Sequence, residues 1–252
     1  MRDPASIIHP TAVVDPRAEI GEGVEIGPYC VVGRGAKIAR KNKLISHVVI
    51  AGKISIGEKN IFHPFAVIGS DPQSKRHHDE IGAVEIGTLN EFREHVTVHA
   101  GTDARVTKIG SHNLFMVGAH VAHDVVLGSH CVLSNAVQLA GHAFVEDYVV
   151  FGGLSGVAQH VRVGESAFVA AGAMCEHDVP PFVVVQGDRA RVRALNKIGL
   201  RRRGFDETTI LALNQAFRLL FVSKEKSVTA LAQLQKNPAV DRLIEAATKP
   251  RS

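Results

Sequence analysis

Histidines gather in one part of the sequence, and their spacing is the first sign of chemistry. The chain has 14 histidines among its 252 residues. Six of them lie between residues 112 and 160: His112, His120, His123, His130, His142 and His160. A neutral imidazole accepts a proton well near pH 7, because its reference pKa is about 6.5. Asp124 directly follows His123 and could orient that ring or stabilise its charged form, so the pair indicates a general base.

A repeat of six residues predicts the elements that carry these side chains. Stepping by six, every position from Ile8 to Ile68 is apolar, and a pattern shifted by one residue runs from Ile109 to Cys175. The fifth residue of most hexads is small. Such a period predicts an all-β solenoid, a parallel β-helix of triangular section with one short strand and one corner per hexad. A narrow interior also explains why the chain has no Trp and only 5% aromatic residues.

The repeat is interrupted twice before it ends. Residues 70–84 are rich in charge and histidine, and eleven residues instead of six separate Val98 from Ile109, so that 101–107 must bulge. Long loops in a regular solenoid are often functional. The paired prolines that follow Asp178 cannot continue a strand ladder. We therefore expect a β-helix domain over 1–187 with excursion loops at 70–84 and 101–107.

The remaining residues, 188–252, predict a C-terminal α-helical domain. A strongly basic stretch leads to Asp206, which is a suitable N-cap residue for a helix that continues through Phe221. Two further amphipathic helices are expected over 227–235 and 239–247. About 60 residues bury little core on their own, so this cap should pack on the last coils or on a neighbouring chain.

Composition excludes several classes of protein. With 45% apolar and 21% charged residues, the chain is not disordered over most of its length. No stretch approaches the roughly 20 apolar residues of a membrane span, and the N-terminus lacks a signal core. The three cysteines, Cys30, Cys131 and Cys175, form no C-x-x-C pair and indicate reduced, buried thiols in a cytoplasmic protein. A net charge of +4 suits an acidic partner or a phosphate-bearing substrate, with no nucleic acid expected.

The hexad register predicts where the histidines lie. His142 and His160 are 18 residues apart, one full coil, and should stack on each other. His123 precedes His142 by one coil plus one residue, and His120 ends its hexad at a corner. A polar corner residue is usually just solvated. Four histidines on one outward edge beside an excursion loop favour a functional site.

Two runs around these histidines carry a family resemblance. They are Gly118-Ala119-His120-Val121-Ala122-His123-Asp124 and Leu139-Ala140-Gly141-His142. Further matches are Ile26-Gly27-Pro28, Val84-Glu85-Ile86-Gly87, Val96-Thr97-Val98-His99 and Asp178-Val179-Pro180-Pro181-Phe182. Together they resemble the UDP-N-acetylglucosamine O-acyltransferases, which use acyl carrier protein and carry out the first step of lipid A synthesis.

The resemblance implies a left-handed β-helix, assembled as a homotrimer with sites between neighbouring subunits. It implies transfer of a 3-hydroxyacyl group from acyl carrier protein to the sugar 3-position, with no cofactor beyond the carrier's phosphopantetheine. His123 matches the general base of the family and Asp124 the residue that supports it. Gly141 matches the glycine whose N–H binds the thioester oxyanion.

The resemblance also implies a set of substrate-binding positions. Those that line the sugar and acyl pocket are matched by His99, His120, His142 and Gln159. Those near the nucleotide and its phosphates are matched by Asn196, Arg202 and Arg203. Ala171 matches a glycine at the floor of the acyl groove, so that acyl length is expected to depend on it.

Several of these positions depart from the usual family pattern. Ser74 replaces the carboxylate expected to contact the sugar, and Arg76 or Lys75 replaces a phosphate-contacting lysine. The other changes are Ala100 for an arginine, Ala158 with His160 for a histidine next to Gln159, and Ile198 for a glutamate. The same chemistry on a variant acceptor, such as the 3-amino sugar nucleotide, is therefore an alternative.

Three other readings remain open from the residues alone. Three histidines can hold Zn²⁺ as in a carbonic anhydrase-like hydratase, although the His120–His123 spacing is narrower than in those enzymes. No metal is expected on the favoured reading. A non-catalytic scaffold would leave His123, Asp124 and Gly141 without a common purpose. An acetyl-CoA-dependent O-acetyltransferase shares the repeat but is not supported by the tail.

Overall fold

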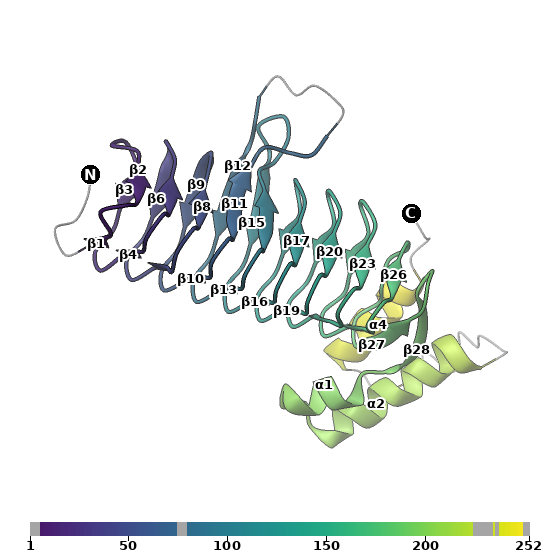
Figure 1. Cartoon of the computed structure of the whole chain (residues 1–252). Helices are drawn as coiled ribbons and strands as arrows, with labels where there is room; N and C mark the ends of the chain where they lie inside the picture. The colour runs from purple at the N-terminus through teal and green to yellow at the C-terminus, as the bar shows by residue number, and fades with distance from the viewer. Residues whose placement is uncertain (1–5, 75–79, 224–233, 235–236, 249–252) are drawn as a thin grey trace.

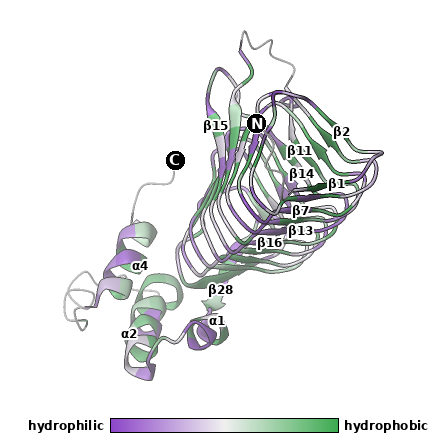
Figure 2. Ribbon diagram, turned by 90° about the vertical axis from the view of Figure 1, so that its left-hand side faces the viewer, coloured by the Kyte–Doolittle hydropathy of each residue, from purple (hydrophilic) through white to green (hydrophobic). Residues whose placement is uncertain are grey.

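The chain forms a parallel β-helix whose three flat faces are sheets (Figures 1 and 2). This computed structural model describes residues 6–74, 80–223, 234 and 237–248. The 11-stranded face holds β1 (Ile7–Ile8), β4 (Glu25–Ile26), β7 (Lys43–Leu44), β10 (Ile61–Phe62), β13 (Glu91–Phe92), β16 (Leu114–Phe115), β19 (Val132–Leu133), β22 (Val150–Phe151), β25 (Phe168–Val169), β27 (Val183–Gln186) and β28 (Arg191–Leu195).

The other two faces complete the triangle. The 9-stranded face holds β2 (Val13–Val14), β5 (Val31–Val32), β8 (Val49–Ile50), β11 (Val67–Ser70), β14 (Thr97–His99), β17 (His120–Val121), β20 (Gln138–Leu139), β23 (Gly156–Val157) and β26 (Met174–Cys175). The 8-stranded face holds β3 (Glu19–Ile20), β6 (Ala36–Ile38), β9 (Lys53–Ile56), β12 (Ala83–Ile86), β15 (Val106–Ile109), β18 (Val126–Leu127), β21 (Phe144–Val145) and β24 (Arg162–Val163). The predicted repeat is confirmed.

The interior is filled by the apolar anchor of each hexad. The second residue of most two-residue strands is buried and the first points outward, as in β19, where Leu133 is fully buried. Phe62, Phe92 and Phe115 stack inside the prism with ring centroids 4.9 and 4.5 Å apart. The three cysteines are buried and unpaired, as predicted.

Both excursion loops leave the same edge of the prism (Figure 1). The first joins β11 to β12 and the second joins β14 to β15. Residues 75–79 of the first loop, and with them Arg76, lie outside the described residues. The two loops contact each other through an antiparallel bridge between Ile81 and Thr102, so the predicted interruptions form one joint structure.

The end of the chain departs from the predicted helical domain in one respect. β28 pairs antiparallel with β27, so residues assigned to that domain extend the first face. Helices follow: α1 (Lys197–Arg202), α2 (Glu207–Phe217), the π-helical turn η1 (Arg218–Val222) and α4 (Pro238–Thr248). Asp206 caps α2 by accepting from the Thr209 N–H, as predicted. The helix expected over 227–235 falls almost wholly outside the described residues.

The corner between the 9-stranded and 8-stranded faces carries His123, Asp124, His142 and His160, and we call it the histidine corner. Asp124, His142 and His160 occupy equivalent turn positions there, each with φ between 61° and 65°. The rings of His142 and His160 stack with centroids 4.6 Å apart, which confirms the predicted stacking. No helix within the described residues is long and apolar enough to cross a membrane.

Candidate active site

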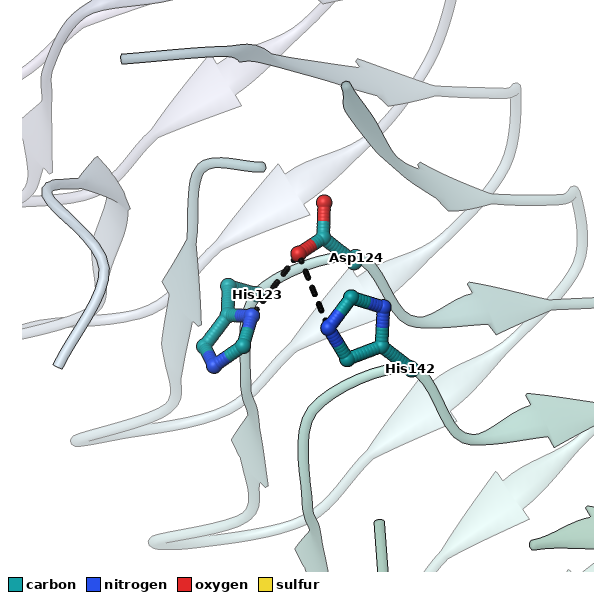
Figure 3. A group of neighbouring side chains, drawn as sticks. All are labelled: His123, Asp124 and His142. Carbon is teal, nitrogen blue, oxygen red and sulfur yellow. Dashed lines mark hydrogen bonds and ion pairs between the residues drawn. The ribbon is translucent and has the colours of Figure 1, made fainter. Parts of the chain in front are cut away.

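His123 and Asp124 form a hydrogen-bonded pair at the histidine corner, just after β17 (Figure 3). His123 Nδ1 lies 2.8 Å from Asp124 Oδ2. An ionised carboxylate only accepts hydrogen bonds, so this contact assigns the ring proton to Nδ1. Nε2 then keeps its lone pair and can take a proton from another molecule.

Asp124 is held as a buried, ionised carboxylate. The residue is 8% exposed, and burial by itself raises the pKa of the carboxyl group. Hydrogen bonds from Thr102 and His123, with the nearby charge of His142, outweigh burial and leave the pKa of Asp124 below its usual value. His142 Nε2 lies 3.5 Å from the same Oδ2 (Figure 3).

A cavity of about 400 Å³ opens beside this pair. Among the residues that line it are His99, His120, His123, Gly141, Gln159 and Met174. It follows the outer surface of the 9-stranded face, where the lining residues His120, Gln138, Gly156 and Met174 are in register on successive strands. Three steps at ~4.8 Å make the floor roughly 14 Å long. The cavity therefore has the shape of a groove.

Gly141 lines this cavity on the coil after His123. Its N–H donates to no residue in the described part of the chain. The solenoid does not need that donor, since proline occupies the equivalent turn position at Pro28 and Pro64. A backbone N–H left free at this position can bind a developing oxyanion.

His99 and His120 enter the cavity as neutral rings. His99 Nδ1 donates to the Asp71 carbonyl oxygen at 2.7 Å, which leaves its Nε2 as an acceptor. His120 Nδ1 lies 2.7 Å from the Thr97 hydroxyl oxygen. Burial lowers the pKa of both rings, that of His120 to about 4. The prediction that His120 lies at a corner is wrong. His120 is the first residue of β17, and its side chain points outward from the flat face because it precedes the buried anchor Val121.

The other predicted positions divide between two regions. Gln159 and Ala158 line the cavity, and His142 adjoins Asp124. Ser74 is an exposed residue of the first excursion loop, and Ala171 is exposed and does not line the cavity. Sequence reasoning missed Thr97, Thr102 and Met174, because their contacts depend on strand register and loop course rather than on residue spacing.

Asn196, Arg202 and Arg203 lie at the C-terminal end, and none of them lines the cavity. Asn196 caps α1 through the Gly199 N–H and donates to the Ser166 carbonyl oxygen. Arg202 is exposed on α1. The Arg203 guanidinium pairs with Glu165 and lies 4.0 Å from the centre of the Tyr148 ring. Within one chain, these residues are separate from the histidines.

One group of described side chains has the composition of a metal site. The ligand atoms of His123, Asp124 and His142 lie within 4.8 Å of one another. They offer two imidazoles and a carboxylate, whereas the zinc alternative requires three histidines. His120 does not join them and contacts Thr97 instead.

Known protein families match both the repeat and the tail of this chain. Residues 178–251 match the family profile described as UDP-N-acetylglucosamine O-acyltransferase, domain 2, and residues 5–40 match the bacterial transferase hexapeptide profile. The chain is 38% identical to LpxA from Acinetobacter baumannii, over 96% of both chains with a TM-score of 0.89. The LpxA enzyme from Moraxella catarrhalis is 40% identical, over 95% of this chain and 96% of that chain, with a TM-score of 0.89.

A third solved structure extends the likeness. UDP-N-acetylglucosamine acyltransferase from Bacteroides fragilis is 33% identical, over 95% of this chain and 96% of that chain, with a TM-score of 0.91. The chain belongs to the UDP-N-acetylglucosamine O-acyltransferase family. As in other members of this acyltransferase family, the β-helix is left-handed, and the predicted fold class is confirmed. The family assignment also confirms that the chain is an acyltransferase.

Proposed function

We propose that the protein transfers a 3-hydroxyacyl chain from acyl carrier protein to the 3-hydroxyl of UDP-N-acetylglucosamine, early in lipid A synthesis. The observation that carries this proposal is the joint placement of His123 and Gly141 on one cavity. His123 offers an unprotonated Nε2, and Gly141 offers a free N–H one coil away. A base next to an oxyanion donor is what acyl transfer from a thioester requires.

The reaction follows from these two groups. His123 Nε2 takes the proton of the sugar 3-hydroxyl as that oxygen attacks the thioester carbonyl carbon. Negative charge develops on the carbonyl oxygen and is stabilised by the Gly141 N–H. Asp124 stabilises the imidazolium through Nδ1. When the tetrahedral intermediate collapses, the C–S bond breaks, and the imidazolium returns its proton to the phosphopantetheine thiolate. No further cofactor takes part.

The cavity residues would hold the two substrates. His99 presents an acceptor and suits a donor group of the sugar, while His120, His142 and Gln159 add polar contacts around the reacting atoms. Ser74 is proposed to face the sugar. Arg76 is proposed to contact the diphosphate, because arginine donates two parallel hydrogen bonds to phosphate oxygens.

A homotrimer would bring the separate region into the site. Asn196, Arg202 and Arg203 do not line the cavity of their own chain, so we propose that they serve the nucleotide at a neighbouring subunit's cavity. Arg203 would have to share its guanidinium with Glu165 for that role. The basic stretch before Asp206 also suits docking of acidic acyl carrier protein.

A variant acceptor is the second candidate. It is favoured by Ala158, which lines the cavity without a side chain that can hydrogen-bond, and by Ser74 in place of a carboxylate. Ile198 adds a 66% exposed apolar side chain on α1 where the family has a glutamate. A 3-amino sugar nucleotide would be acylated by the same His123 and Gly141.

The test is a product assay with defined substrates. Purified protein is incubated with UDP-N-acetylglucosamine or its 3-amino analogue and with C10 to C16 3-hydroxyacyl carrier proteins, and products are read by mass spectrometry. His123→Ala is the control. Product from the ordinary sugar that the variant does not form supports the proposal. Product from the amino sugar alone supports the second candidate, and product from neither contradicts both.

A further inference from the structure

The second excursion loop brings Thr102 onto the carboxylate of Asp124. The Thr102 N–H lies 3.0 Å from Oδ1, and its hydroxyl oxygen lies 2.7 Å from Oδ2. Thr102 is 2% exposed and Asp124 is 8% exposed, so water competes little for these hydrogen bonds. The contact exists because the repeat is interrupted: Thr102 belongs to the residues inserted between β14 and β15.

The loop is itself fixed on both sides of this contact. The Thr102 carbonyl oxygen accepts from the Arg105 N–H at 2.8 Å, and Thr102 bridges to Ile81 of the first loop. Thr107, at the start of the returning strand, accepts from the Asp124 backbone N–H at 2.8 Å through its hydroxyl oxygen. The loop therefore holds Asp124 at its backbone and at both carboxylate oxygens.

Asp124 Oδ2 accepts from two donors at once, the Thr102 hydroxyl and His123 Nδ1. Because Oδ1 is held by the Thr102 N–H, the carboxylate cannot rotate without breaking a bond to Thr102. We propose that Thr102 is a positioning residue, which fixes the Asp124 carboxylate and through it the tautomer and direction of the His123 ring. This inference rests on the proposed function, in which His123 Nε2 removes the acceptor proton.

Several charged or titratable groups face this pair and contribute to its pH dependence. His142 and His160 lie on the following coils, and Arg105 acts on His142 from the loop. His99 and His120 face His123 from β14 and β17. None of these groups changes when only the Thr102 hydroxyl is removed, so a pH effect of that change reports on Asp124 and His123.

The experiment compares Thr102→Val, which loses the hydroxyl at similar size, with Thr102→Ser, which keeps both donors. We expect Thr102→Val to lower kcat about tenfold to hundredfold with KM changed less than about threefold, because a misdirected base slows the proton transfer. The acid limb of its kcat/KM profile should move to lower pH, since a carboxylate that turns away from Nδ1 stabilises the imidazolium form of His123 less. Thr102→Ser should keep kcat and the position of the acid limb at their wild-type values.

A second measurement is independent of substrate. In ¹⁵N-labelled protein, the His123 Nδ1–H resonance should be resolved and slow to exchange in the wild type and in Thr102→Ser, and broadened or lost in Thr102→Val. Thr102→Ala serves in place of Thr102→Val if that variant does not fold, as judged by circular dichroism and size-exclusion chromatography.

The outcomes separate the two proposals. An unchanged kcat, acid limb and Nδ1–H resonance in Thr102→Val would overturn the positioning role. A lower melting temperature with an unchanged acid limb and resonance would also overturn it, because Thr102 would then act on stability alone. Wild-type protein that is inactive on every acceptor contradicts the proposed function, while the resonance still tests Thr102.

Discussion

Gly141 and the ring of His123 share one space at the histidine corner. A Cβ atom on residue 141 would lie 2.6 Å from Cε1 and 2.8 Å from Nε2 of His123. A Cβ atom does not come this close to another heavy atom, so the ring can lie where it does only beside a glycine. The Asp124 carboxylate holds the other side of the ring through Nδ1. Gly141 thus offers its N–H and leaves room for the base.

Gly141→Ala should therefore lower activity strongly without unfolding the chain. The added methyl group pushes His123 out of line with the acceptor, and a displacement of about 1 Å is enough to lower kcat about a hundredfold. The backbone at residue 141 needs no left-handed conformation, so alanine is sterically permitted there. Steady-state kinetics and the melting temperature are measured together.

The matched control is Gly153→Ala. Gly153 lies two residues after β22, as Gly141 lies two residues after β20, but at another corner of the prism. A Cβ atom on Gly153 would have the Asn135 carbonyl oxygen as its nearest neighbour, at 3.4 Å. This variant should keep wild-type kcat and melting temperature. Equal activity of Gly141→Ala and Gly153→Ala would contradict the role given to the space beside His123.

The repeating part of the fold was predictable because one side chain per hexad decides it. An inward anchor every six residues can be satisfied only by stacked coils, and the same arithmetic placed His142 over His160. His120 was misplaced for a definable reason. The residue before the anchor belongs to the strand, so it lies on a flat face in register with Thr97 instead of at a corner.

Contacts made by the insertions could not be predicted from spacing. Thr102 and Asp124 are 22 residues apart, and their contact depends on the course of a loop that interrupts the repeat. The strand β28 was missed because it lies in the basic stretch after the repeat has ended, and its five residues are too few for the alternation of arginine with Val192 and Ala194 to stand out. Pairing with β27, rather than its own pattern, makes it a strand.

The low pKa of His120 predicts a loss of stability in mild acid. Burial lowers this pKa from 6.5 to about 4, and the nearby His99 and His123 add to the effect. The unfolded chain then binds the proton more tightly than the folded chain does. The free energy of unfolding should therefore be highest above pH 6.5 and fall as pH drops toward 4. His120→Gln should lessen the fall between pH 7 and 5 by about 1–2 kcal/mol.

Urea unfolding at the two pH values, at one protein concentration, checks this expectation. His177→Gln is the control, because His177 is exposed and its loss should leave the fall unchanged. An identical fall in wild type and His120→Gln would show that other groups carry the acid sensitivity.

Met174 should limit the length of the acyl chain more than Ala171 does. The Met174 sulfur lies 2.9 Å from the place where a Cβ on Gly156 would be, so the thioether covers the bare part of the groove floor. Met174→Ala opens that space and should make the preferred acyl chain about two methylenes longer. A packed pocket discriminates by about 1–3 kcal/mol per methylene, so the change should be measurable. Ala171 does not line the cavity.

Competition among C10 to C16 carrier substrates measures this preference as ratios of kcat/KM. Ala171→Gly is the matched variant and should leave the ratios unchanged if the groove of a single chain sets the length. A shift in Ala171→Gly with none in Met174→Ala would return the acyl-length role to Ala171 and would indicate a groove completed by another subunit.

Arg242 should fasten helix α4 to the β-helix. Its guanidinium lies 2.6 Å from Glu146 and also pairs with Glu165, whose side chains are 15% and 11% exposed. Arg242→Met leaves these carboxylates with fewer cations and should weaken the docking of α4 by about 1–3 kcal/mol. Hydrogen exchange should show faster exchange of the α4 amides while kcat is retained, since α4 does not line the cavity.

Arg189→Met is the control, because Arg189 pairs with the exposed Glu176 at 3.7 Å and such pairs contribute about 0–1 kcal/mol. Equal protection of α4 in both variants would show that its apolar contacts through Val240 and Leu243 hold the helix without the ion pairs.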